Sequence, residues 1–456
     1  MHRVLSEVNL VNLPGIPRIW IDFLCGRLST PPASQRMDEL LARTDDIQRQ
    51  AARREDLCRL LEDAKDLCSD RALENLQRLK QPGSIAVVAN LSPALFGGPE
   101  FQIFKCLTAI KVCEHLAQYK LTAVPICWIQ ASPRADFPTD SIQLLDAESE
   151  LRCLGLQKSG TKDLSAGDIL PVSQINGLLA QMDDFGQGAF DPEIFVILRA
   201  SFESETTFAQ ATARLIAALM EEWGILVVNS AAPDYQSHMQ DIIAPLSQKP
   251  LTESVVQSML LPVAAFVVDP FEINSYLDTQ PEFETLKSSP PMAWPQCNAT
   301  IMDARSRKIL ERYRLDLHQL YAGEGALIRL FADSMPREAS AKLLALKLET
   351  ENQVDKLTTL YSAGGGFGKT AASIKERIEF QLNRLREHFD AASERNRKTM
   401  NRHIRRVCNL LAPNGRTQER ELAGIQLPLR YSRAVIRSLY EKLDILNTEH
   451  QLISMD

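Results

Sequence analysis

The sequence contains no uninterrupted run of about 18 apolar residues, the length that a helix needs to span a bilayer. The chain is therefore not expected to cross a membrane. Its N-terminal apolar stretch lacks a plausible signal-peptidase cleavage site and is interrupted by Pro14, Pro17 and Asp22. These interruptions argue against a secretory signal peptide.

Cysteine and histidine do not form a recognisable ligand pattern. The nine cysteines include no C-x-x-C pair, and the seven histidines show no ligand spacing with one another or with cysteine. We therefore expect no structural metal site. An odd number of scattered cysteines is typical of reduced thiols, most of them small core residues. This usage predicts a cytoplasmic protein.

We expect charge of either sign to be spread along the chain rather than concentrated in one segment. The formal net charge is −7 over 456 residues, with neither a basic face nor a long acidic tail. Nucleic acid is therefore not an expected partner. The length suffices for about two or three domains and a large buried core.

What the sequence does contain is a strand, a glycine turn and a helix in succession over residues 84–112. Ile85–Ala89 is a short β-branched apolar run, Gly97 and Gly98 mark a sharp turn, and helical apolar spacing starts at Glu100. Free N–H groups at such a turn and helix N-terminus can bind an anion. The alternative is that the glycines only relieve crowding at the turn.

Apolar β-rich runs alternate with amphipathic helices from residue 84 to about residue 295, after a mostly helical N-terminal part. This alternation predicts an α/β fold with a largely parallel sheet. The segment 131–172 has few apolar runs and is interpreted as an insertion or small subdomain. The expected strands are 85–89, 123–129, 194–199, 225–229 and 263–268, and the expected helices are 100–118, 174–182, 206–222 and 272–278.

Strand signals disappear after about Ile301, and charged helical sequence follows. Leucines at helical spacing fill residues 338–361, and apolar residues at alternating steps of three and four fill 374–392. Two such helices predict an antiparallel coiled-coil hairpin. We therefore expect two domains, an α/β core over residues 1–300 and a helical coiled-coil domain over residues 301–456.

The segment from Gly364 to Thr370 ends like a phosphate-binding loop. The first glycine of that motif would fall at Ala363, and no strand precedes it. A hairpin turn between the two helices is the preferred interpretation.

Five blocks of sequence resemble, in order, the BshC family of bacillithiol biosynthesis, whose members are described as cysteine-adding enzymes. The similarity is spread over most of the chain. The blocks are Leu95-Phe96-Gly97-Gly98-Pro99 with Lys105, Pro125–Ile129, Thr207-Phe208 with Ala213-Arg214-Leu215, Leu261-Pro262 with Pro270 and Glu272-Ile273, and Pro413 and Gly415 with Gln418-Glu419-Arg420.

The resemblance implies a Rossmann-like core with a C-terminal coiled coil and a C–N bond-forming ligase reaction. In that reaction the carboxylate of L-cysteine joins the amine of glucosaminyl-malate. Because amide formation in water is uphill, the carboxylate needs activation, and an adenine nucleotide is the implied cofactor. A homodimer formed through exposed helical seams is a further expectation.

Several polar positions depart from the family pattern. A Thr-Gly-Gln-Gln-like run after the first strand is replaced at Ala89–Ala94, and a Glu-Asp-His-Asp-like cluster after the second strand keeps only Asp136. A family glycine is replaced by Asp269 and a tyrosine by Ser275, while Glu253 and Gln296 stand where arginines are expected. Loss of a histidine base would lower the rate strongly.

The candidate residues follow from the resemblance and from the ends of the expected strands. The candidate site residues are Asp136 as the catalytic group and Asn90, Ser92, Gly97, Gly98, Lys105, Trp128 and Arg134 as substrate- or nucleotide-binding groups. Each has a structural alternative: Lys105 as a solvated surface residue, Trp128 as core and Asp136 as a turn residue. The motif around Gln418 and Arg420 is interpreted as domain packing.

Three functional hypotheses remain open at this point. The first is a divergent cysteine ligase of bacillithiol biosynthesis. The second is a catalytically degenerate homologue that retains small-anion or nucleotide binding, and the third is a coiled-coil assembly protein. The retained glycine turn and Lys105 favour binding, whereas the lost polar residues disfavour the family chemistry.

Overall fold

Five parallel strands form the central sheet of the computed structural model, in the order β6-β3-β2-β7-β8. Their bounds are β2 Ile85–Leu91, β3 Ala123–Ile129, β6 Leu226–Asn229, β7 Val263–Val268 and β8 Met292–Pro295. The strands are apolar and buried almost throughout, as expected for a parallel sheet covered on both faces. The predicted Rossmann-like α/β fold is confirmed.

The structure describes residues 7–28, 36–50, 54–63, 67, 69–132, 134, 136–157, 165–203, 206–243, 251–334, 337–361 and 367–455. None of the helices in these ranges is long and apolar enough to cross a membrane.

The order of the strands creates a topological switch point between β2 and β7. From β2 the chain proceeds to β3 and then to β6, and it returns to add β7 on the opposite side of β2. In open α/β sheets, ligands bind beyond the carboxyl ends of the strands at such a point. The polar residues that follow β2, β3 and β7 are therefore brought to one edge.

Helices surround this sheet, and α2, α4, α5 and α8 pack against its strands. The helices of this part are α1 Arg18–Leu24, α2 Arg36–Gln50, α3 Arg54–Asp63, α4 Asp70–Lys80, α5 Glu100–Ala117, α6 Val172–Gly186, α7 Pro192–Ser201, α8 Phe208–Leu219, α9 Pro233–Ile243, α10 Glu253–Leu260, α11 Ile273–Asp278 and α12 Gln280–Thr285. Single-turn 3₁₀ helices lie at η1 Leu10–Asn12, η4 Leu95–Gly97 and η5 Glu221–Trp223.

The strand predicted at 194–199 is wrong, because these residues form most of helix α7. The Asp191 side chain caps the helix by accepting from the backbone of Glu193, and Pro192 occupies the first turn. Ile194 and Leu198 are buried one turn apart, whereas Val196 between them is 67% exposed. One apolar face at helical spacing outweighs the β propensity of the run.

The segment predicted as an insertion contains a β-hairpin of β4 Ser141–Leu145 and β5 Leu151–Gly155, which pair antiparallel. Residues 158–164 of this segment lie outside the described part of the chain.

A second sheet changes the predicted division of the chain. Strand β10 His450–Met455 pairs parallel with β9 Ala299–Asp303 and antiparallel with β1 Glu7–Val8. The expectation that strands end near Ile301 is wrong for β10, a short strand whose partner lies far away in the sequence. The first compact unit therefore combines residues 1–307 with 409–456 rather than ending at residue 300.

The end of the chain adds short helical elements to the first unit. They are η6 Pro413–Gly415, α18 Gln418–Glu421, α19 Gln426–Tyr431 and α20 Ala434–Lys442.

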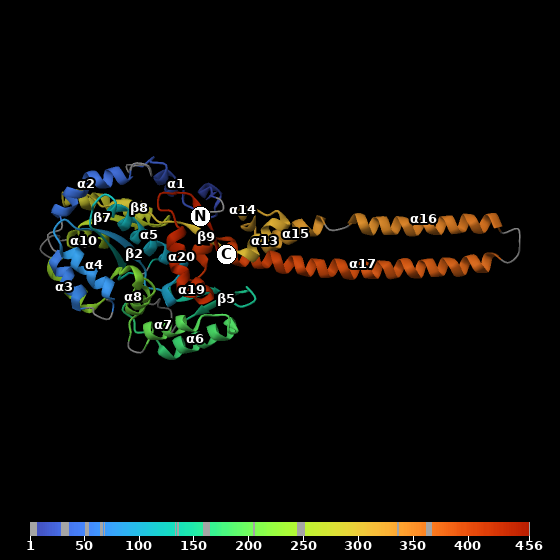
Figure 1. Cartoon of the computed structure of the whole chain (residues 1–456), viewed down its shortest axis with the longest axis horizontal. Coiled ribbons are helices and arrows are strands. Elements are labelled where there is room, and N and C mark those ends of the chain that lie inside the picture. Colours follow the sequence, from blue (N-terminus) through green and yellow to red (C-terminus); the bar gives the residue numbers. More distant parts are fainter. Residues whose placement is uncertain are drawn as a thin grey trace. The chain divides into compact units, whose positions relative to one another are not determined.

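The second unit, residues 308–408, is helical, and its two long helices form a hairpin (Figure 1). The helices from residue 304 on are α13 Ala304–Tyr313, α14 Leu317–Leu320, α15 Glu324–Ser334, α16 Arg337–Tyr361 and α17 Phe367–Leu411. Ion pairs Lys347–Glu379 at 2.7 Å and Lys375–Asp355 at 2.9 Å fix an antiparallel register. The predicted coiled coil is confirmed.

The glycines at 364–366 lie outside the described residues, and Gly368, Lys369 and Thr370 are in the first turns of α17.

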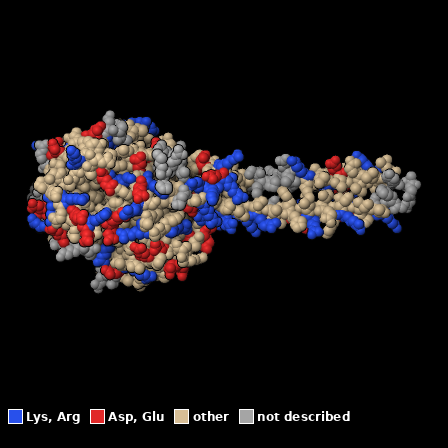
Figure 2. Space-filling model, viewed as in Figure 1, with Lys and Arg blue, Asp and Glu red and all other residues tan. Residues whose placement is uncertain are grey.

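Basic residues gather on part of α17, unlike the even spread expected from the sequence. The segment Arg395–Arg406 contains arginines and a lysine but no Asp or Glu. Figure 2 shows Lys and Arg side chains along this helix. Arg397 and Lys398 pair with Glu394, which offsets part of the charge.

Candidate functional site

A cavity of about 710 Å³ lies in the first unit, beyond the carboxyl ends of β3 and β7. Its wall includes residues 14–16, the loops after these strands, Pro99 just before α5, the β4–β5 hairpin and residues of the segment 414–423. The residues with charged side chains in the wall are Asp136, Arg416, Glu419, Arg420 and Glu421. A concave, partly apolar site at a switch point is the expected place for a small ligand.

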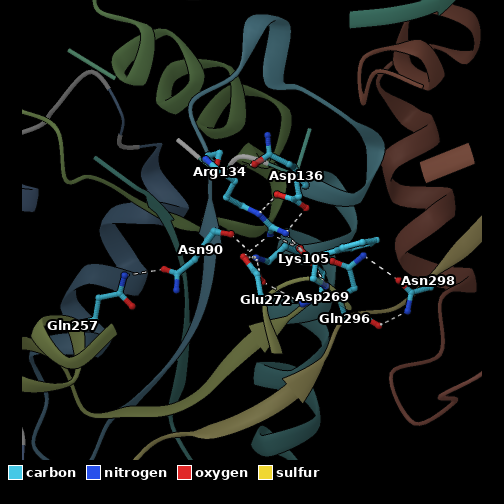
Figure 3. A network of polar contacts seen from close by, with 12 residues as sticks. Asn90, Lys105, Arg134, Asp136, Gln257, Asp269, Glu272, Gln296 and Asn298 are labelled. Atoms are coloured by element: carbon cyan, nitrogen blue, oxygen red, sulfur yellow. Dashed lines mark hydrogen bonds and ion pairs between the residues drawn. The ribbon is translucent and has the colours of Figure 1, made fainter. Parts of the chain in front are cut away.

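A cluster of six charged side chains shares Asp136 and Arg420 with the cavity wall, and we refer to it as the charged cluster. Figure 3 labels Lys105, Arg134, Asp136, Asp269 and Glu272 of this cluster. The members of the charged cluster are Lys105, Arg134, Asp136, Asp269, Glu272 and Arg420. They come from α5, from the loops after β3 and β7, and from α18. The fold therefore brings together three of the predicted site residues, Lys105, Arg134 and Asp136.

Lys105 is fully buried rather than solvated. Its Nζ lies 2.6 Å from each carboxylate oxygen of Glu272 and donates to the carbonyl of Asn90 at 2.5 Å. Because an ammonium group has three donors, this arrangement uses all of them.

Arg134 is the centre of the charged cluster. Its Nε donates to Asp136 at 2.7 Å, its Nη2 to Asp269 at 3.1 Å, and its Nη1 lies 2.6 Å from Glu272. Arg420 also pairs with Asp136, and its guanidinium lies between the rings of Phe101 and Phe271, 4.2 and 4.3 Å from their centroids. These contacts tie the loops after β3 and β7 to α18.

The three cations and three carboxylates stabilise one another in the charged state. Burial alone would raise the pKa of Asp269, but the positive charges of Arg134 and Arg420 outweigh it and hold the pKa well below its usual value. Burial likewise opposes the lowering of the Asp136 pKa, which the hydrogen bond and charge of Arg134 produce. The carboxylates of both residues are therefore ionised at neutral pH.

The glycine turn does not present free amides to a ligand, contrary to the sequence-based expectation. The N–H groups of Gly97 and Gly98 donate to the carbonyls of Ala94 and Leu95 at 3.1 and 2.9 Å. Both glycines have positive φ, 82° and 68°, and a Cβ at Gly98 would lie 2.8 Å from the Ala94 Cβ. Their role here is the sharp turn and close packing.

Residues 422–424 of the C-terminal segment form hydrogen bonds with the same turn. Glu100 N–H donates to the Leu422 carbonyl at 2.9 Å, and Gly424 N–H donates to the Gly98 carbonyl at 2.8 Å. The N-terminus of α5 is thus occupied by the chain itself. The N–H groups of Gly97, Gly98 and Glu100, which the predicted anion site would use, therefore have acceptors within the chain.

Asn90, Ser92 and Trp128 hold the edge of the sheet together. Asn90 Oδ1 accepts from Gln257 at 2.7 Å, and Ser92 Oγ accepts from the backbone of Arg134 at 3.1 Å. Trp128 is fully buried and its Nε1 donates to Glu253 at 2.7 Å. This placement agrees with the core alternative for Trp128 and not with a stacking platform.

Glu419 and Glu100 are the functional candidates that the sequence interpretation missed. Glu419 lines the cavity, is 3% exposed and accepts from the backbone of Ala299 at 3.0 Å. Burial raises the pKa of Glu419 to about 8. Burial and the neighbouring Glu419 raise the pKa of Glu100, whose carboxylate oxygens have no hydrogen-bond partner among the described residues.

The family motif around Gln418 and Arg420 contains Glu419, and this motif is the feature of the sequence that could have identified Glu419 as a site residue. The interpretation as domain packing fits Gln418, which bonds to the backbone N–H and carbonyl of Ile301 at 2.6 and 2.9 Å. Glu419 and Arg420, the next two residues, instead reach the cavity.

The residues expected to hold nucleotide phosphates do not fit that role, because the turn amides are engaged and Lys105 and Arg134 are paired with carboxylates. Among the described residues, no group of three or more His, Cys, Asp or Glu side chains is arranged to hold a metal ion.

Two sequence models match the chain. The BshC N-terminal Rossmann-like domain of bacillithiol biosynthesis matches residues 31–250, and the BshC C-terminal coiled-coil domain matches residues 299–455.

Curated relatives support the same assignment. A protein of Koribacter versatilis named "Putative cysteine ligase BshC" is 21% identical over 98% of this chain and 99% of its own length. A protein of the same name from Solibacter usitatus is 21% identical over 83% of this chain and 86% of its own length. Another, from Chlorobaculum tepidum, is 29% identical over 39% of this chain and 32% of its own length. Both characteristic domains are matched in order along one chain, and this protein belongs to the BshC family of bacillithiol biosynthesis.

Proposed function

We propose that this protein is a cysteine ligase that joins the carboxyl group of L-cysteine to the amine of glucosaminyl-malate. The observation that carries the proposal is the cavity at the switch point, whose wall contains a buried carboxyl group, Glu419, with a pKa of about 8. Titratable groups with shifted pKa values in a cleft are typical of acid–base chemistry. The family and the names of the relatives supply the reaction class.

In the proposed step, the amine nitrogen attacks the carboxyl carbon of cysteine. The new C–N bond forms, the C–O bond to the activated oxygen breaks, and the amine gives up a proton. The carboxylate of Glu419 is the proposed proton acceptor, because its pKa is near the working pH, where a general base is most effective.

Activation of the carboxyl group is assigned to an adenine nucleotide by the family resemblance, and this remains a proposal. The glycine turn and Lys105 do not offer free donors for its phosphates.

The direct test incubates the purified protein with glucosaminyl-malate, L-cysteine and ATP and measures bacillithiol by mass spectrometry. Glu419→Gln should lower kcat by about 10²–10⁴, the usual contribution of a general base. Glu379→Gln, at an exposed coiled-coil position paired with Lys347, is the control and should retain activity. Absence of product from the wild-type protein contradicts the proposal.

The competing proposal is a homologue that binds its small molecule without catalysis. The internal pairing of every cation in the charged cluster favours this alternative. It predicts no bacillithiol, but a rise in Tm on adding glucosaminyl-malate or cysteine. If neither product nor a thermal shift is observed, both proposals are wrong.

A homodimer is proposed on the basis of exposed apolar side chains of the coiled-coil hairpin. Leu344, Leu357 and Leu360 on α16 and Phe380 and Leu385 on α17 are 51–76% exposed. Burying such residues is favourable. Light scattering after gel filtration should give twice the chain mass of 51.1 kDa.

A further inference from the structure

Cations at a switch point usually suggest an anionic ligand, but here the protein supplies the anions itself. We infer that Asp269 and Glu272 are resident counter-ions that exclude anionic groups from Lys105 and Arg134. The part of the site beside Lys105 and Arg134 then binds the uncharged or cationic end of a ligand. Phosphate or carboxylate groups of the ligand bind elsewhere in the cavity. The part of this inference that concerns the acceptor amine rests on the proposed function.

Lys105 and Arg134 have no N–H donor left for an incoming anion. Lys105 uses its three N–H donors on Glu272 and on the carbonyl of Asn90. All three guanidinium nitrogens of Arg134 contact a carboxylate of Asp136, Asp269 or Glu272. An incoming anion would therefore have to displace one of these carboxylates.

The two counter-ions, Asp269 and Glu272, are themselves held in place by backbone N–H groups. Asp269 is 0% exposed, and its Oδ1 accepts from the backbone N–H of Phe271 at 2.7 Å. Glu272 Oε2 accepts from the backbone N–H of Asp269 at 3.1 Å. Displacement would leave these partly buried N–H groups without their acceptors, which is costly.

The charges of the charged cluster balance without a ligand. The charged cluster contains three cations and three carboxylates, so its net charge is zero. A phosphate or dicarboxylate would add uncompensated negative charge beside Asp136, Asp269 and Glu272, and like charges at close range repel strongly in a partly buried site.

The arrangement also gives an orientation for the proposed acceptor. Asp136, Glu419 and Arg420 belong to the cavity wall, and their side chains are largely buried. Arg416, whose side chain is 71% exposed, lies in the same wall and pairs with Glu421 at 3.1 Å. The amine of glucosaminyl-malate is therefore expected beside the carboxyl groups, and its malate group beside Arg416.

The test is to neutralise the counter-ions and look for a new anion site. Inorganic phosphate and, separately, malate are titrated calorimetrically at low salt into the wild-type protein, Glu272→Gln and Asp269→Asn/Glu272→Gln. Both variants should bind each anion at least tenfold more tightly than wild type. Adding Lys105→Met to them should abolish the gain.

Glu253→Gln is the matched control. Glu253 is another largely buried carboxyl group at the same sheet edge, but its partners are Trp128 and Ser230 rather than a cation. Its neutralisation should create no anion site. Because the double variant loses two of three carboxylates and could fail to fold, Glu272→Gln, which keeps both contacts of Arg134 with Asp269, serves as the second variant.

Two outcomes would overturn the inference. One is an unchanged anion affinity in the folded variants, since Asp269 and Glu272 would then not be what excludes anions. The other is anion binding by wild type that Lys105→Met removes. The titrations contain neither cysteine nor an amine acceptor, so failure of the ligase assay does not affect their interpretation.

Discussion

Individual carboxyl groups give the cavity wall its chemistry. Glu100 and Glu419 are both buried, and burial raises the pKa of each above its usual range. Asp136 and Asp269, close by in the charged cluster, have lowered pKa values because arginines face them. Four neighbouring carboxyl groups are thus divided into a protonatable pair and an ionised pair, a division that the proposed acid–base chemistry would use.

The raised pKa of Glu419 predicts the pH dependence of activity. A general base acts when deprotonated, so kcat/KM should rise about tenfold per pH unit up to about pH 8 and then level off. A pH–rate profile from pH 6 to 9 measures this limb. A profile that is flat between pH 6 and 8 would show that Glu419 is not the base.

The buried Glu100 predicts how stability depends on pH. Its folded-state pKa is raised, so its stabilising contribution is complete below the unfolded value of 4.5 and is lost as pH rises toward the folded pKa. Above pH 4.5, the free energy of unfolding of Glu100→Gln should therefore fall less steeply with pH than that of wild type. The two slopes should differ by up to about 1.4 kcal/mol per pH unit.

Urea denaturation of both proteins at pH 5 and pH 8 measures this difference. Glu376→Gln, at an exposed position of α17, is the control. Equal pH slopes in wild type and Glu100→Gln would contradict the expected titration.

At the scale of elements, the turn between β2 and α5 packs the sheet against the C-terminal segment. Gly98 has φ 68° and ψ −158°, a conformation that is essentially restricted to glycine. The carbonyl of Gly98 accepts from Gly424, and the amide of Glu100 donates to Leu422. The turn therefore joins the sheet to the C-terminal segment that also forms the cavity wall.

Gly98→Ala should lower the free energy of unfolding by roughly 2–5 kcal/mol, the sum of backbone strain and overpacking. A Cβ there would lie 2.8 Å from both Ala94 Cβ and Gln102 Nε2. Gly188→Ala is the matched control, because it also has positive φ but no atom within 4 Å of the added Cβ, and it should cost about 1 kcal/mol. Equal losses in the two variants would rule out the packing role.

At the scale of the whole molecule, the first unit is discontinuous in sequence. Residues 1–307 and 409–456 form it together, and the helical hairpin is inserted between them. Strand β10 closes the second sheet by pairing with β9, and its Leu452 and Ile453 are buried. The C-terminal segment also supplies Glu419 and Arg420 to the site.

This organisation predicts different effects of two deletions. Replacing residues 351–375 with a short Gly-Ser linker keeps the Lys347–Glu379 pair and should leave the stability of the first unit unchanged. Removing residues 450–456 should cost about 3–6 kcal/mol, because two buried aliphatic side chains are lost. All four tryptophans precede residue 308, so their fluorescence reports unfolding of the first unit. Similar losses in both variants would contradict the proposed division.

The sequence alone determined the helices and strands that follow from the spacing of apolar residues close together in the chain. The buried runs at β2, β3, β6 and β7, the helix of α5 and the seam of α17 follow from apolar spacing, and the family follows from ordered blocks of residues. Local spacing failed at 194–199, where a cap and a one-sided apolar face produced a helix. It also gave no account of β10, whose partner strand lies about 150 residues earlier in the chain.

Tertiary structure alone decided which groups at the sheet edge remain available to a ligand. A glycine turn and a lysine have the same local sequence whether or not something covers them. Here Leu422 and Gly424 cover the turn, and Glu272 pairs with Lys105, through contacts between residues far apart in the chain. The raised pKa of Glu419 likewise depends on burial, which is a property of the folded molecule and not of the neighbouring residues in sequence.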